Sequence, residues 1–271
     1  MAEPEVLASG YELTEGPRVD ADGRIWFTDA LGGGVHRWAD GEVETIVPKR
    51  RGVGGLALHA DGGVLVGGRN LVHVHPDRDD QVVFEPPEGV VGFNDMCATA
   101  DGSVLVGALR YHPFLGGEPE PGEFWFLRAR AGGDASPEMV LDGISLPNGC
   151  GPSPDGTTLY ACDYGTGEVH ALTDGGARVF ARTPNGEADG LAVDHEGGVW
   201  VALGNGEAIV GYSPDGELRH TVDLPGRFVA SLAFDGADAM IVATANSAAH
   251  PGAVLRLAAA VPGPIHHSAR I

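Results

Sequence analysis

Residues 189–202 read Asp-Gly-Leu-Ala-Val-Asp-His-Glu-Gly-Gly-Val-Trp-Val-Ala, and this stretch decides the fold. The apolar residues at 191–193 and 199–202 favour two short strands, and the Glu196-Gly197 pair between them is typical of a tight turn. The stretch therefore predicts a strand, a turn and a second, antiparallel strand.

The same phrase occurs six times along the chain. Its turn signal recurs at residues 22, 61, 101, 155, 196 and 237, at intervals of 39, 40, 54, 41 and 41 residues. Repeats of about 40 residues that hold several short strands indicate a β-propeller. We therefore expect an all-β protein, a six-bladed β-propeller with four antiparallel strands per blade, and a single domain over residues 1–271. The six copies lie at 21–27, 60–66, 100–106, 154–160, 195–201 and, more weakly, 236–242.

The two ends of the chain are expected to share one blade. The last copy ends near residues 254–257 without a convincing fourth strand, whereas residues 4–8 precede the first inner strand and have the character of a strand themselves. An N-terminal strand that closes the last blade leaves no exposed sheet edge at the junction.

Charge and composition exclude several classes of protein. The chain has 17 Lys and Arg against 38 Asp and Glu, a net charge of −21, which disfavours binding to nucleic acid or to anionic membranes. No apolar run is long enough to span a bilayer, and residues 1–10 lack the pattern of a signal peptide. We expect a cytoplasmic protein, a monomer or small homo-oligomer, that acts on a small molecule. Three cysteines without paired spacing predict reduced, mostly buried thiols: Cys97, Cys150 and Cys162.

One position of the repeat carries oxygen-bearing side chains. Seven residues before each turn signal stand, in order, Glu15, Gly54, Asn94, Asn148, Asp189 and Ala230. In a propeller these positions begin the inner strands and meet at one mouth of the central tunnel. Two carboxylates and two amides suit a hard divalent cation, with Ca²⁺ first and Mg²⁺, Mn²⁺ or Zn²⁺ as substitutes. Gly54 and Ala230 would leave an open side for substrate.

A simpler interpretation exists for each of these residues alone. Asn148-Gly149 and Asp189-Gly190 are also common turn dipeptides, and Asn94-Asp95 could cap a loop. The shared position in the repeat favours the metal site, because every one of the four precedes a strand of the same rank.

At these residues the chain resembles the regucalcin (senescence marker protein)/gluconolactonase family of six-bladed propellers. Luciferin-regenerating enzymes belong with this family, and diisopropylfluorophosphatase-type phosphotriesterases are more distant relatives. The resemblance implies that Glu15, Asn148 and Asp189 bind a divalent metal, that Asn94 binds it or the adjacent substrate, and that Asp189 is also the catalytic carboxylate. The matching phrases are Glu15-Gly16-Pro17, Phe93-Asn94-Asp95, Leu146-Pro147-Asn148-Gly149 and residues 188–194.

The chemistry expected of such a site is hydrolysis of a lactone or a related ester. A metal would polarise the carbonyl, and Asp189 would act as general base or attack directly as a nucleophile. Many sugar lactonases of the family carry Arg two residues before the Asn of the third blade, where this chain has Gly92. Sugar specificity therefore does not follow from the resemblance.

The longest interval between turn signals contains a loop, residues 110–122, that we expect to overhang the metal face as a lid. The expected substrate contacts are Asn94, Asp95, Tyr111, His112 and Phe114. Further polar residues are expected on loops of the same face, whereas three histidines recur on third strands away from the tunnel. The loop residues are Asp29, Asp163, Asn205, Asn246, His250 and the basic run 49–51, and the histidines are His36, His73 and His170.

Two alternatives to a gluconolactonase-like enzyme stay open. One is a family member that acts on an apolar lactone or a phosphotriester-like compound, or that catalyses a biosynthetic rearrangement. The other is a non-catalytic propeller that binds proteins, which would have no need of four convergent oxygen ligands.

Overall fold

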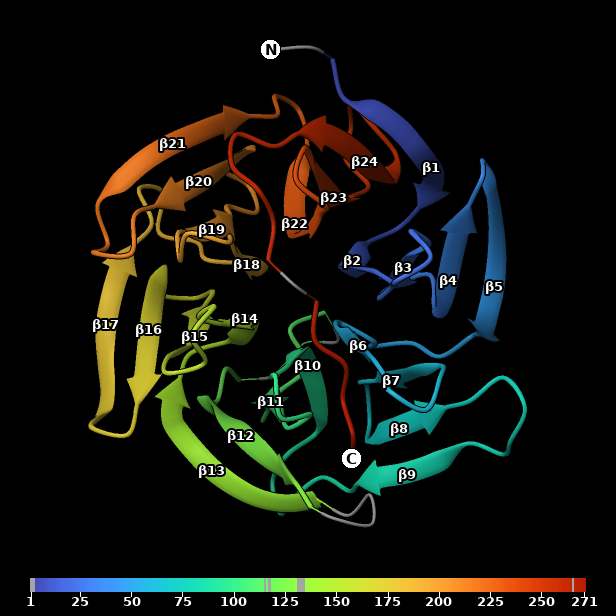
Figure 1. The fold of residues 1–271 in the computed structure, drawn as a ribbon, viewed down its shortest axis with the longest axis vertical. Helices are drawn as coiled ribbons and strands as arrows, with labels where there is room; N and C mark the ends of the chain where they lie inside the picture. The colour runs from blue at the N-terminus through green and yellow to red at the C-terminus, as the bar shows by residue number, and fades with distance from the viewer. Residues whose placement is uncertain (1–2, 115, 117, 131–134, 265) are drawn as a thin grey trace.

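Six four-stranded antiparallel sheets surround a central axis in the computed structural model (Figure 1). The structure describes residues 3–114, 116, 118–130, 135–264 and 266–271. Within these residues there are 24 strands and no helix. The predicted six-bladed β-propeller is therefore confirmed. No helix that could cross a membrane occurs in the described part of the chain.

Each blade runs from an inner strand at the axis to an outer strand at the rim. The first three blades are β2 (Thr14–Val19), β3 (Ile25–Asp29), β4 (Gly34–Ala39) and β5 (Glu42–Pro48); β6 (Leu56–Leu58), β7 (Val64–Val66), β8 (Leu71–Val74) and β9 (Gln81–Phe84); and β10 (Gly92–Ala98), β11 (Val104–Leu109), β12 (Gly122–Ala129) and β13 (Ala135–Ile144). The others are β14 (Pro147–Pro152), β15 (Leu159–Asp163), β16 (Glu168–Thr173) and β17 (Gly176–Arg182); β18 (Leu191–Val193), β19 (Val199–Ala202), β20 (Ala208–Tyr212) and β21 (Leu218–Asp223); and β22 (Phe228–Asp235), β23 (Ala239–Ala245), β24 (Gly252–Ala258) and β1 (Glu5–Tyr11).

In the first and fifth blades the turn is held by the aspartate that directly follows the inner strand, Asp20 or Asp194. Asp194 accepts hydrogen bonds from the backbone N–H groups of Glu196 and Gly198, both at 2.8 Å, and from the indole N–H of Trp200 at 2.8 Å. Gly197 has a φ of +86°, a conformation that glycine adopts without strain. The repeated phrase is therefore a strand, a tight turn and a second strand, and in the first and fifth blades this turn is centred on an aspartate.

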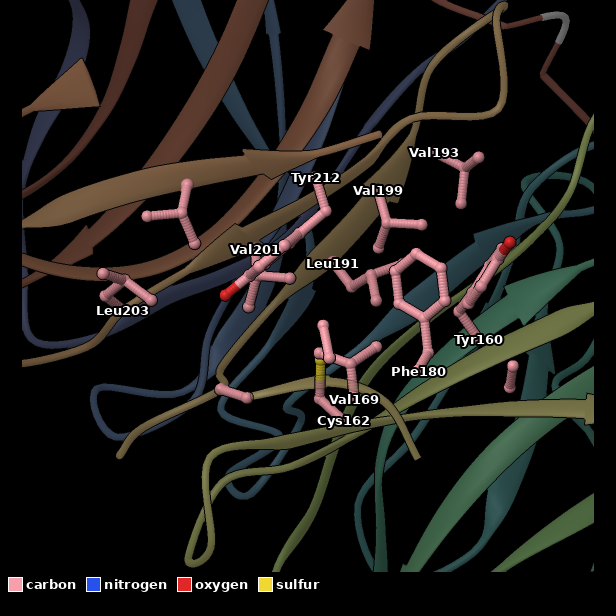
Figure 2. Packing of buried hydrophobic residues seen from close by; sticks show 14 of the residues in the cluster. Tyr160, Cys162, Val169, Phe180, Leu191, Val193, Val199, Val201, Leu203 and Tyr212 are labelled. Atoms are coloured by element: carbon pink, nitrogen blue, oxygen red, sulfur yellow. The ribbon is translucent and has the colours of Figure 1, made fainter. Parts of the chain in front are cut away.

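The apolar residues of the phrase pack between neighbouring blades. Figure 2 shows the contact between the fourth and fifth blades. Burial of each Val, Leu or Phe side chain stabilises the fold by about 1.5–3 kcal/mol. The three cysteines are buried and free, as expected. The cluster in Figure 2 includes Tyr160, Cys162, Val169 and Phe180 from the fourth blade and Leu191, Val193, Val199, Val201 and Tyr212 from the fifth.

The N-terminal strand closes the sixth blade, as predicted. β1 pairs antiparallel with β24, with Glu5 opposite Arg256, and extends three residues beyond the expected end at residue 8. A buried hydroxyl ties this blade to the first. Thr14 Oγ1 lies 2.9 Å from the carbonyl oxygen of Ala253 and accepts a hydrogen bond from the Thr244 N–H at 2.9 Å.

We expect Thr14→Val to lower the free energy of unfolding by about 2 kcal/mol, because the buried Thr244 N–H loses its acceptor. Thr14 is fully buried, so water cannot replace the hydroxyl. Urea denaturation followed by tryptophan fluorescence measures the change. Thr221→Val, on an exposed position of β21, is the matched control and should change stability by less than about 0.5 kcal/mol. Equal effects of the two substitutions would contradict the assigned role of the hydroxyl.

Candidate metal and active site

The four predicted ligands lie at the starts of inner strands and are linked to one another. Asn148 hydrogen-bonds the Asp189 carboxylate. The Asn94 amide nitrogen donates to the carbonyl oxygen of Pro147 at 2.9 Å, which brings the third blade to the residue beside Asn148. Glu15 is close enough to Asp189 and Asp95 for their charges to raise its pKa. The structure therefore brings together Glu15, Asn94, Asn148 and Asp189, with Asp95 beside them.

Close contacts between neighbouring inner strands position these residues. A Cβ atom on Gly149 would lie 2.3 Å from the backbone nitrogen of Leu191, and one on Gly190 would lie 2.3 Å from Ser231 Oγ. Two backbone hydrogen bonds cross the same boundaries, from Gly149 N–H to the Asp189 carbonyl at 3.1 Å and from Gly190 N–H to the Ala230 carbonyl at 2.8 Å. These glycines allow close packing of the blades.

The turn interpretation of the Asn and Asp dipeptides does not hold in the third and fourth blades. Asn148 and Gly149 lie inside β14, and Asn94 and Asp95 lie inside β10. The expectation of an open side at Gly54 is wrong as well. A Cβ on Gly54 would lie 1.9 Å from Asn94 Oδ1, so the missing side chain makes room for the Asn94 amide.

Three buried carboxylates meet at this end of the tunnel. Glu15, Asp95 and Asp189 are 8 %, 4 % and 2 % exposed. Burial, followed by the charges of Asp189 and Asp95, raises the pKa of Glu15 well above its usual range. Burial and the charges of Asp95 and Glu187 do the same for the pKa of Asp189, which the hydrogen bond from Asn148 partly offsets. Burial raises the pKa of Asp95 to about 6, against the opposing charge of Arg18.

The oxygens of these residues fit a divalent cation. One oxygen on each carboxylate, Glu15 Oε2, Asp95 Oδ1 and Asp189 Oδ1, is buried without a hydrogen-bond partner. Such atoms are costly unless something positive pairs with them. The described residues hold no cluster of three or more His, Cys, Asp or Glu side chains arranged for a metal. The predicted set is instead a mixture of two carboxylates and two amides, the oxygen donors that Ca²⁺ and Mg²⁺ accept.

Two of the loop aspartates have a different task. Asp29 accepts hydrogen bonds from the N–H groups of Glu12, Leu13 and Gly32, and Asp163 accepts them from those of Ser145, Leu146 and Gly165. Each carboxylate thus fixes the segment that leads into the inner strand of its own blade. Asp29 and Asp163 therefore help to position β2 and β14, the strands that carry Glu15 and Asn148.

The predicted lid residues differ in their exposure. Tyr111 is half-buried, and burial together with the charge of Asp163 raises its pKa, whereas His112 is exposed and Phe114 is 64 % exposed. Arg110 anchors the start of the loop through two bonds to the Glu123 carboxylate, at 2.7 and 3.2 Å. Leu115 and Gly117 of the predicted loop lie outside the described residues.

The remaining candidates have packing roles. Arg50, within the basic run 49–51, donates to the carbonyl oxygens of Gly67 and Asn70 at 2.9 and 2.8 Å. The Asn246 N–H donates to the Glu12 carbonyl at 2.7 Å, and His250 packs with Ser247 in the same loop. The histidines His36, His73 and His170 lie on the third strands β4, β8 and β16, as expected.

Two polar residues beside Asp189, Tyr164 and Glu187, escaped the sequence analysis, whereas Asn205 was expected on a loop of this face. Glu187 accepts hydrogen bonds from the backbone N–H and side-chain amide of Asn205, at 2.7 and 3.0 Å. Burial, then the charges of Asp189 and Glu187, raise the pKa of Tyr164. Tyr164, Glu187 and Asn205 therefore form a polar wall from the fourth and fifth blades. The sequence could have identified Tyr164 by its position, because it directly follows a second strand on the metal face.

Comparison with known proteins agrees with this architecture. A family model described as the SMP-30/Gluconolactonase/LRE-like region matches residues 13–246. L-arabinolactonase from Azospirillum brasilense is 31 % identical over 61 % of this chain and 56 % of its own length. Pentonolactonase XacC from Haloferax volcanii is 29 % identical over 88 % of this chain and 82 % of its own. The crystal structure of regucalcin from Agrobacterium tumefaciens, described as a calcium-binding protein, has a TM-score of 0.86 at 23 % identity, over 99 % of this chain and 98 % of that one. Since the family model covers most of the sequence, this chain belongs to the SMP-30/gluconolactonase/LRE-like family.

Proposed function

We propose that this protein is a divalent-metal-dependent hydrolase of lactones or related esters. The observation that supports the proposal is the pair of buried carboxylates, Glu15 and Asp189, each of which has an oxygen without a hydrogen-bond partner. A propeller that only binds proteins gains nothing from such a costly arrangement. The relatives named as lactonases support the same reaction class.

Glu15, Asn148 and Asp189 would hold the cation, with Asn94 as a fourth ligand or a substrate contact. Ca²⁺ is the first choice because all four residues offer oxygen and none offers thiolate or imidazole. A regucalcin of the same fold is described as calcium-binding, which supports this choice. When bound, the ion would supply polarisation of the substrate carbonyl.

In this proposal Asp189 moves the proton. Its Oδ1 has no partner, its side chain is held by Asn148, and its surroundings favour uptake of a proton. As a general base, Asp189 would take a proton from water while the water oxygen bonds to the lactone carbonyl carbon. The ring C–O bond then breaks, and the leaving oxygen recovers the proton, which yields a hydroxy acid. Direct attack by Asp189 through an acyl-enzyme is the alternative route.

The surroundings of the site favour a broader substrate range than sugar lactones. Gly92 offers no side chain to polar substrate groups, and a Cβ there would lie 3.1 Å from the Gly68 carbonyl oxygen, so this position is filled by backbone. The exposed Phe114 adds apolar surface. An apolar lactone or a phosphotriester-like compound is therefore the second candidate. If the substrate carries hydroxyl groups, they would bind at the wall of Tyr164, Glu187 and Asn205.

Hydrolysis is tested with aldonolactones, alkyl-substituted lactones and an aryl phosphotriester, by acid release in a pH-stat with Ca²⁺ present. We expect lactone turnover, and a loss of about 10²–10⁴-fold in kcat/KM for Asp189→Asn because the proton acceptor is gone. Asp174→Asn, in an exposed turn, is the matched control and should leave kcat/KM unchanged. Turnover of the phosphotriester with no activity on any lactone would overturn the reaction class.

Stability without metal should fall as pH rises. The buried carboxylates have folded-state pKa values above their unfolded values, so the unfolded chain loses protons first, and the free energy of unfolding falls from about pH 4 upwards. The rise of the Asp95 pKa from 3.8 to about 6 corresponds to on the order of 3 kcal/mol above about pH 7. Asp95→Asn should therefore be more stable than the wild type by that amount at pH 7 in EDTA, and equal to it below about pH 4.

Urea denaturation across this pH range, in EDTA and in Ca²⁺, measures both effects. Ca²⁺ should stabilise the wild type at pH 7, and Asp189→Asn should lose most of that gain. A pH-independent difference between Asp95→Asn and the wild type would contradict the assigned burial of charge. A wild type that retains no divalent ion after purification, and that loses no stability in EDTA, would rule out the metal site.

The contact between Gly54 and Asn94 offers a test that leaves every ligand in place. Gly54→Ala puts a methyl group where Asn94 Oδ1 lies, so the amide must move, and we expect Ca²⁺ affinity to fall by about 10–100-fold in calorimetric titration. Gly175→Ala, whose Cβ would lie 3.6 Å from Thr173 Oγ1, is the control. Adding Asn94→Ala to Gly54→Ala should cause little further loss. Unchanged Ca²⁺ affinity in Gly54→Ala would remove Asn94 from the metal site.

A further inference from the structure

After β24, residues 259–264 run from the sixth blade toward the middle of the ring, and residues 266–271 run from there toward the second and third blades (Figure 1). Ala269 and Ile271, near the end of this C-terminal tail, are buried. Its backbone hydrogen bonds link His195 with Pro262, Gly263 with Gly236, Ala269 with Leu58, and Arg270 with Gly102. The blade residues among these lie at or next to the turns that end the inner strands. The tail therefore covers the tunnel end opposite Glu15 and Asp189.

A cavity of about 220 Å³ lies between this tail and the inner strands. Pro264, His266 and His267 of the tail contribute to its lining, together with the whole of β18 and residues of β10, β14 and β22. A cavity of about 150 Å³ in another protein is large enough for benzene. The space under the tail is therefore sufficient for a small aromatic or branched aliphatic molecule.

The ionisable side chains of this cavity are bases and thiols. Arg18, His195, His266 and His267 line it, and none of the described lining residues is Asp or Glu, although the chain carries a net charge of −21. Asp95 and Asp235 lie close enough behind this lining for charge to act between them and Arg18 and His266. The lining itself presents N–H donors without carboxylates, which favours an anion. The guanidinium of Arg18 donates to the carbonyl oxygens of Pro17 and Met96 at 2.7 and 2.5 Å, which leaves three of its five N–H groups for other partners.

The rest of the lining is largely apolar. Leu58, Val193, Leu232 and Phe234 form walls that would strip water from a ligand without offering hydrogen bonds. A strongly hydrated ion such as phosphate gains little from such walls. A ligand with one anionic end and an apolar body satisfies both parts of the lining, because a planar carboxylate also matches the fork of an arginine.

We propose that the cavity under the C-terminal tail binds a small organic monocarboxylate, with its carboxylate on Arg18 and the histidines and its apolar body against Leu232 and Phe234. This site lies further along the inner strands than the candidate active site, and its lining begins two residues after Asn148 and Asp189, at Cys150 and Leu191. Asn148 begins β14 and Cys150 to Pro152 end it in the cavity lining.

Benzoate is the probe, titrated into the Ca²⁺-loaded protein by calorimetry and by two-dimensional NMR. We expect saturable binding with a Kd on the order of 1 mM or below. Benzamide has the same shape without the charge, and phosphate has charge without the apolar body. Both should bind at least about tenfold more weakly. Absence of benzoate binding, or equal binding of benzamide or phosphate, would overturn the proposal.

Variants locate the bound benzoate. Arg18→Gln should weaken binding by at least about tenfold, and His266→Gln, on the exposed tail, tests the same site if Arg18→Gln does not fold. Arg219→Gln, an exposed arginine on β21, is the matched control and should bind like the wild type. Asp189→Asn should also keep benzoate affinity. Loss of binding in Asp189→Asn with retention in Arg18→Gln or His266→Gln would place benzoate at the metal and refute the cavity site.

Discussion

The close approach of neighbouring inner strands is the constraint on which the rest of this structure depends. The residue after each predicted site position packs against the next blade so tightly that a side chain rarely fits: a Cβ on Gly55 would lie 2.6 Å from the Asp95 backbone, and one on Gly190 would lie 2.5 Å from that of Ser231. Six blades can surround one axis only if most of these contacts involve glycine or another small residue. The preceding residue then begins the inner strand at the tunnel mouth. Ring packing and the gathering of Glu15, Asn94, Asn148 and Asp189 therefore have one cause.

This packing also explains why the site is electrostatically unfavourable on its own. Glu15, Asp95 and Asp189 lie on three different blades, and the ring brings them into a space that excludes water. Each carboxylate has an oxygen without a hydrogen-bond partner. Arg18 is the cation whose charge lowers the pKa of Asp95. Local supports such as Asp29 and Asp163 are instead fully occupied by backbone N–H groups. The carboxylates with hydrogen-bond partners hold the strands in place, and the carboxylate oxygens without a partner are available to bind a ligand.

Most of the fold could be predicted because the chain repeats one phrase. The turn aspartates and the apolar residues of 189–202 determine a local structure. Because the phrase repeats about every 40 residues, the same structure is predicted in every blade. Closure by the N-terminal strand was also predictable, since the last copy lacks a strand. Features that occur once were not: Tyr164 and Glu187 meet through folding of two blades, and the tail reaches Leu58 from the far end of the chain. The error at Gly54 has the same origin, because an alignment of the chain with itself cannot show which neighbour fills a missing side chain.

The pairing of β1 with β24 has a consequence for biosynthesis. Glu5 faces Arg256, so the sixth sheet cannot be completed until β24 has left the ribosome. Until then the first blade has no sixth blade to pack against, and the backbone N–H and C=O groups of β1 that pair with β24 have no partner. Contacts between residues so distant in sequence form slowly, and an unpaired strand of this kind is open to association with other chains. Glu5, Ser9 and Gly10 are exposed along β1, but so is Val6 at 52 %, so the strand keeps an apolar side chain on its surface even after the blade is closed.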